Sequence, residues 1–143
     1  MIYLEYERLL DAQKRTIERY QAVLDQEAEL FDRTQPQGTD YGTERVQASA
    51  VSTAIDRYIE AKDKLRIDQR KAELVEAMEE WEELIESKIT ALYASQSRED
   101  RIYRMKAIEN RKVAEIAREL HYSPESIYRT LRAIRKKIKD DKK

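Results

Sequence analysis

The stretch KVAEIARELHYSPESIYRTLRAIRKKI, Lys112 to Ile138, contains two amphipathic helix patterns that only a tight turn separates. Its first half places four apolar residues on one helical face, at Val113, Ile116, Ala117 and Leu120. Ala117 is small at the point where a second helix has to cross closely. Two short helices joined in this way are typical of a helix-turn-helix.

The turn residues predict where the second helix begins. Ser123 is placed to cap it, Pro124 takes the first helical position and Glu125 the second. Tyr122 is expected to fill the corner between the helices. His121 stands where many helix-turn-helix proteins have Gly, the residue that best tolerates a left-handed backbone.

The second helix has an apolar face and a basic face. Its apolar residues fall within about 60° of one another and are expected to face the core: Ile127, Leu131, Ile134 and Ile138. The opposite face and its flanks form the predicted DNA-binding surface: Ser123, Glu125, Ser126, Tyr128, Arg129, Arg132 and Lys136.

The chemistry of this surface suits nucleic acid, although the sequence leaves the individual roles open. Arg129 and Arg132 are suited to guanine edges or phosphates, and Glu125 to a cytosine amino group. Ser126 and Tyr128 are expected to position the DNA backbone. Further along, three lysines are expected to neutralise phosphate: Lys136, Lys137 and Lys139.

Charge is distributed unevenly along the chain. Residues 1 to 96 hold 13 Lys and Arg against 21 Asp and Glu, a net charge of -8, whereas residues 97 to 143 hold 15 against 8, a net charge of +7. A basic segment of this kind is what phosphate binding requires. We therefore predict two domains, an acidic arm at 1–96 and a DNA-binding helix-turn-helix domain at 97–143.

The arm is predicted to be helical throughout. Apolar residues recur every seven positions at Tyr3, Leu10, Ile17, Leu24 and Phe31, which predicts a helix over residues 2–33. The segment TQPQGTDYGT at 34–43 contains both Gly and one of the two Pro and is expected to be a loop. Helices follow over 44–94, with a break near 66–71 where the apolar pattern changes phase.

The expected fold is all-α, a long antiparallel helical hairpin arm followed by a three-helix helix-turn-helix unit. Ser95 or Ser97 is expected to cap the first of these three helices, with Ile102, Met105 and Ile108 as its apolar contacts. The stripe of the first arm helix is too broad for a strict two-stranded coiled coil, so it is expected to pack against a helix of its own chain. We also expect a homodimer or higher homo-oligomer to form through the arm.

Enzymatic chemistry is not expected. The chain has no Cys and a single His, and it lacks a Gly-rich phosphate loop, so we predict no catalytic residues, no metal site and no cofactor. No apolar run approaches the roughly 20 residues that span a bilayer, which predicts no membrane partner. The absence of Cys suits the cytoplasmic location that we expect.

The segment IARELHYSPESIYRTL resembles the fourth region of RNA polymerase sigma factors, as it occurs in small regulators of Gram-positive phages and prophages of the ArpU and RinA types. TERVQASAVSTAIDRYIEAKDKL, Thr43 to Leu65, resembles the N-terminal part of a phage family of sigma-like proteins. The resemblance implies a phage-encoded transcriptional regulator in a bacterial host cell, with duplex DNA and RNA polymerase as partners. The acidic arm does not match the promoter-melting regions of a full sigma factor, which implies an accessory role.

Two other functions fit the same pattern. Terminase small subunits of phages, which take part in DNA packaging, also join a helix-turn-helix to oligomerising helices. Alternatively, a non-enzymatic inhibitor would use the same surfaces to bind a host nucleic-acid-binding protein. A ring-sized oligomer would favour the first, and binding to a protein instead of duplex DNA would favour the second.

Overall fold

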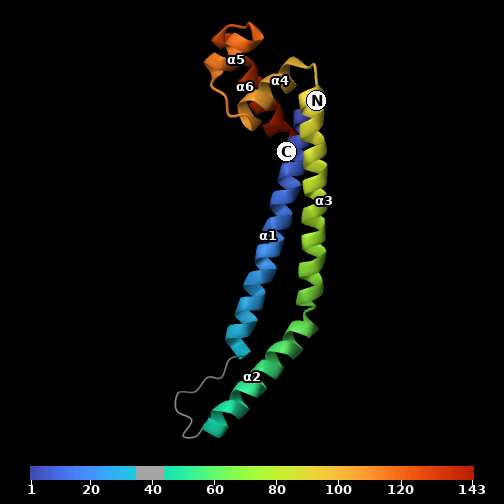
Figure 1. The fold of residues 1–143 in the computed structure, drawn as a ribbon, viewed down its shortest axis with the longest axis vertical. Helices are drawn as coiled ribbons and strands as arrows, with labels where there is room; N and C mark the ends of the chain where they lie inside the picture. Colours follow the sequence, from blue (N-terminus) through green and yellow to red (C-terminus); the bar gives the residue numbers. More distant parts are fainter. Residues whose placement is uncertain (35–43) are drawn as a thin grey trace. The chain divides into compact units, whose positions relative to one another are not determined.

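A computed structural model describes the backbone of residues 1–34 and 44–143, and the side chains of 1–34 and 53–143. The described residues form six α-helices and one π-helical turn. Figure 1 labels the α-helices. In chain order these are α1 (Ile2–Thr34), α2 (Glu44–Lys64), α3 (Ile67–Ala94), α4 (Arg98–Tyr103), the π-helical turn η1 (Arg104–Ile108), α5 (Val113–Leu120) and α6 (Pro124–Asp141). No strand occurs in the described ranges, so the predicted all-α fold is confirmed.

The predicted break in the middle of the chain is present. α2 ends at Lys64 and α3 begins at Ile67, so residues 44–94 form two helices. Arg66 has a positive φ of 55°, which a continuing right-handed helix excludes. The predicted loop at 34–43 lies, apart from Thr34, outside the described residues.

The chain divides into two compact units, which are described separately. One unit consists of residues 14–79 and the other of residues 1–13 together with 80–143. In the first of these, Lys71 pairs with Glu27 at 3.0 Å, and Phe31 meets Tyr58 edge to face. Ile67 is fully buried there, so the start of α3 is fixed by apolar packing.

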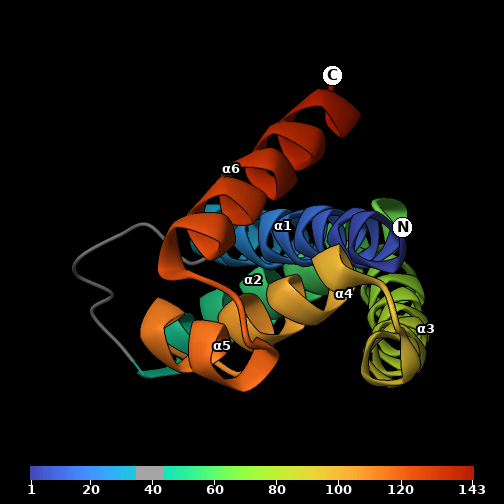
Figure 2. The same ribbon diagram turned by 90° about the horizontal axis from the view of Figure 1, so that it is seen from above.

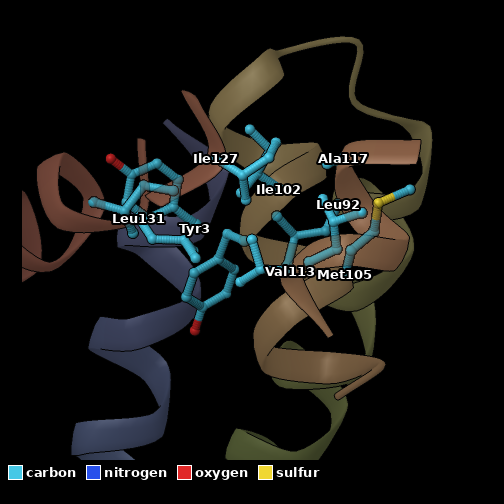
Figure 3. Packing of buried hydrophobic residues seen from close by; sticks show 11 residues of the cluster. Tyr3, Leu92, Ile102, Met105, Val113, Ala117, Ile127 and Leu131 are labelled. Atoms are coloured by element: carbon cyan, nitrogen blue, oxygen red, sulfur yellow. The ribbon is translucent and has the colours of Figure 1, made fainter. Parts of the chain in front are cut away.

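The second unit has the larger apolar core. Helices α4, α5 and α6 contribute most of it, and Tyr3 from α1, Leu92 from α3 and Met105 from η1 complete it (Figure 3). The members without solvent exposure are Tyr3, Leu92, Ile102, Ile116 and Ile127. The prediction that Ile102 and Met105 pack inward is confirmed, and Ile108 is half-buried.

The first turn of α1 is anchored to the start of α4. The backbone N–H of Tyr3 donates to Asp100 Oδ1 at 3.1 Å, and Ser95 Oγ donates to the other carboxylate oxygen at 2.8 Å. Asp100 thereby satisfies one of the N–H groups that a helix start leaves unpaired. It is buried, so the carboxylate needs both donors. Ser97 occupies the N-cap position of α4, but its side chain forms no capping hydrogen bond.

This anchoring moves the unit boundaries away from the predicted division between residues 96 and 97. Residues 1–13 group with the C-terminal helices, and so do residues 80–96 of α3 and the following link. The physical reason is the burial of Tyr3, whose ring stacks on Tyr103 at a centroid distance of 5.4 Å. Sequence periodicity assigns residues to helices but does not show which distant helix covers them.

The seven-residue stripe of α1 is buried only in part. Ile17 and Phe31 are about half exposed, whereas Thr16 and Val23 are buried in their place. At 100° per residue, Val23 lies about 200° around the helix from Tyr3. α1 therefore buries different faces in the two units, which a single repeat cannot predict.

Candidate nucleic-acid interface

The connection between α5 and α6 is a tight turn of three residues (Figure 2). His121 adopts the left-handed conformation, with φ 59° and ψ 39°. The N–H of Tyr122 donates to the carbonyl of Ala117 at 3.0 Å, the bond that closes a helix end followed by a left-handed residue. His121 is thus left-handed at the turn position where a preference for Gly was expected.

The start of α6 follows the prediction. The N–H of Ser126 donates to Ser123 Oγ at 3.2 Å, and Pro124 opens the helix. This cap satisfies one free N–H, and the fixed φ of Pro suits the first helical turn. Both features hold the first turn of α6 in a defined conformation.

The facing of α6 is set by its buried residues. Ile127, Leu131 and Ile134 are at most 8% exposed, as the apolar pattern predicts. Because these residues fix the rotation of the helix, the opposite face is directed to solvent. The exposed predicted site residues are Ser123, Glu125, Tyr128, Arg129, Arg132 and Lys136.

The cations of α6 and its C-cap fall into two groups. Lys137 Nζ contacts Glu99 at 2.8 Å, and Lys142 Nζ contacts Asp11 at 3.4 Å. Among the described residues, the others form no ion pair: Arg129, Arg132, Arg135, Lys136 and Lys139. These five lie within about 120° of one another around the helix. We call them the free cation face.

Lys137 departs from its predicted role. It was expected to neutralise phosphate beside Lys136 and Lys139, but it faces Glu99 on another side of α6. Tyr3 OH also donates to Glu99, at 2.8 Å. Burial alone would raise the pKa of Glu99, but the hydrogen bonds from Lys137 and Tyr3 outweigh it and lower that pKa below its ordinary value of 4.5. Lys137 thus ties α6 to α4.

Arg135 and Lys106 were not predicted. With Arg132 they line an open hollow of about 480 Å³, whose apolar lining includes Val113 and Leu131. Arg135 follows Arg132 by three residues, so the helical spacing alone was sufficient to find it. The residue spacing along α6 could not predict Lys106, because the position of Lys106 depends on the π-helical turn η1.

Ser126 is half-buried and already bonded. The guanidinium of Arg98 donates from Nη2 to Ser126 Oγ, and it lies over the ring of Tyr122, 4.2 Å from the centroid. Tyr122 is 41% exposed, so the prediction that it fills the corner is wrong. Its ring supports Arg98 instead. The sequence pattern of α5 and α6 did not predict this contact, because Arg98 belongs to α4.

No candidate for metal binding emerges within the described residues. They contain no group of three or more His, Cys, Asp and Glu side chains close enough to hold an ion. None of the described helices is long and apolar enough to cross a membrane.

Comparison of the chain with family models, curated proteins and solved structures finds no match.

Proposed function

We propose that this chain is a DNA-binding transcriptional regulator and that α5, the turn and α6 act as a helix-turn-helix on duplex DNA. The observation that carries the proposal is the free cation face, five exposed cations that form no ion pair among the described residues and lie on the part of α6 turned away from its buried residues. Unpaired cations on a rigid helix attract phosphate, and binding releases the counterions of DNA. The tight turn leaves the start of α6 exposed, as insertion into the major groove requires.

Within this proposal the residues of α6 divide by position. Arg129 and Arg132 lie near the helix start, where side chains reach base edges. Glu125 is exposed beside them and suits the amino group of cytosine. Lys136 and Lys139 lie further along the helix and suit phosphate.

The finer parts of the proposal rest on the sequence resemblance. It supports a phage-type regulator with a sigma region-4-like unit that acts in the bacterial cytoplasm and contacts RNA polymerase. Oligomerisation through the N-terminal helices fits the exposed apolar residues Ile17, Ile55 and Ile59, each between 47% and 49% exposed. The proposal includes no enzymatic activity.

The proposal is tested by selecting random duplex DNA on the purified full chain, with the oligomer mass measured in the same buffer. We expect one enriched sequence motif, and a two-fold repeat if the protein is a dimer. Absence of enrichment, with weak binding that disappears when salt is added, would contradict it. A ring-sized oligomer on DNA would favour the packaging alternative, and stable binding to a host protein without DNA binding would favour the inhibitor.

A further inference from the structure

We propose that Arg98, at the start of α4, binds a phosphate of the DNA backbone beside α6. The inference rests on the proposed function, because it adds a contact from outside α5 and α6 to the same interface. Arg98 lies 28 residues before Ser126 in the chain, yet the two side chains are hydrogen-bonded. The interface therefore continues from α6 across the turn to α4.

Two contacts hold the guanidinium in place. The ring of Tyr122 lies under it, and Ser126 Oγ accepts one of its N–H groups. A stacked guanidinium has already lost part of the rotational freedom that binding would otherwise remove. The ring covers one side of the guanidinium, and the exposed side chain leaves other N–H groups accessible to an acceptor.

Arg98 has unused donors, and no described side chain compensates its charge. A guanidinium carries five N–H donors, and the contacts described for Arg98 engage one, at Nη2. The side chain is exposed, and among the described residues it forms no ion pair. A bidentate acceptor such as phosphate matches the remaining donors.

Arg104 provides the internal comparison. It also stacks on a tyrosine, with its guanidinium 4.8 Å from the ring centroid of Tyr93. Arg104 is half-buried, however, and its Nε lies 4.0 Å from a carboxylate oxygen of Glu109. The same contact with a tyrosine ring therefore occurs with an internal anion at Arg104 and, among the described residues, without one at Arg98.

The position at the edge of α6 favours phosphate over a base. Ser126 lies about 100° around the helix from Glu125, which is near the centre of the free cation face. Groups at the flank of a recognition helix meet the sugar-phosphate backbone, whereas those at its centre meet base edges. Arg98 therefore contributes affinity and leaves sequence preference unchanged.

The inference also assigns a different role to Ser126, which was predicted to contact DNA itself. Its hydroxyl is bonded to Arg98, so it acts by positioning the guanidinium. In a double-mutant cycle, Ser126→Ala should weaken DNA binding in the wild-type background and have no further effect in the Arg98→Ala background. Equal losses in the two backgrounds would show that Ser126 acts on DNA independently.

The test measures DNA affinity across a salt series for full-length variants, on the motif that selection gives. Arg98→Ala should lower affinity roughly tenfold and reduce the slope of log K against log salt by about 1 in magnitude. Arg98→Lys should keep the slope and lose part of the affinity, because the charge remains without the planar stack. Tyr122→Phe keeps the ring and should bind as the wild type does, whereas Tyr122→Leu should behave like Arg98→Lys.

Two controls separate the outcomes. Arg57→Ala removes an exposed cation of α2 and should leave the slope of log K against log salt unchanged. Urea unfolding shows whether each variant is folded. A folded Arg98→Ala protein with wild-type affinity and slope would overturn the inference while the proposed function stands. If the wild type itself binds no duplex DNA, the proposed function fails, and the inference with it.

Discussion

His121 adopts the backbone conformation on which the turn between α5 and α6 depends. Its φ of 59° lies in the left-handed region, which costs β-branched side chains most. His121→Val should therefore lower the free energy of unfolding by about 1 kcal/mol or more, and His121→Gly should not lower it. Chemical denaturation of both variants checks this. Equal stability of the Val and Gly variants would show that the turn tolerates any residue.

Residues that act through local geometry were predictable. The Ser123 cap and the Pro124 start follow from their order in the chain, and the structure has both. Arg98 and Lys106 were not predictable, because each reaches α6 from an element that the helix pattern of α6 does not include. Local patterns indicate capping and facing, but not the neighbours that tertiary packing supplies.

At the scale of the element, α6 is defined by the contrast between its buried and exposed faces. Ile127 has no solvent exposure, so Ile127→Asp places an unpaired charge in the core and should unfold the unit that contains α4, α5 and α6. Ala133→Asp is the matched control, because Ala133 is exposed on the same helix. Circular dichroism during thermal unfolding measures both. Cooperative melting of Ile127→Asp at the wild-type temperature would contradict the facing of α6.

Element boundaries were predicted where a strong signal marks them. The change of apolar phase near Arg66 indicated the break between α2 and α3, and Ser123 with Pro124 indicated the start of α6. The π-helical turn η1 carries no comparable signal. Its carbonyls accept bonds from five or six residues ahead, as in the bond from the N–H of Glu109 to the carbonyl of Arg104 at 3.0 Å. Such a turn depends on packing around Met105, which is buried.

At the scale of the whole molecule, the N-terminal turn and the C-terminal helices depend on each other. Tyr3 and Glu99 link α1 to α4, and Lys137 links α4 to α6. Helix periodicity predicted the helices on both sides but not this long-range docking, because Tyr3 and Glu99 are 96 residues apart in the chain. The charge asymmetry of the sequence likewise did not show that Lys137 is paired internally.

This docking has a predicted pH dependence. The pKa of Glu99 is lower in the folded state than its ordinary value of 4.5, because Lys137 and Tyr3 stabilise the carboxylate despite its burial. Its contribution to stability is therefore present above that value and is lost as pH falls through the folded pKa. Denaturant unfolding at several pH values should show wild type more stable than Glu99→Gln near neutral pH, with the difference shrinking in acid. A difference that stays constant across this range would argue against the ion pair.

The central claim is that the free cation face of α6 binds duplex DNA. The most direct measurement compares the DNA affinity of Arg129→Ala/Arg132→Ala with that of Arg57→Ala/Lys64→Ala, which removes two exposed cations of α2. Both variants lose two positive charges, so the overall charge is matched. The α6 variant should lose about 1–3 kcal/mol of binding free energy for each base contact, and the α2 variant should bind DNA nearly as the wild type does. Equal affinities for the two variants would contradict the claim and move the interface away from α6.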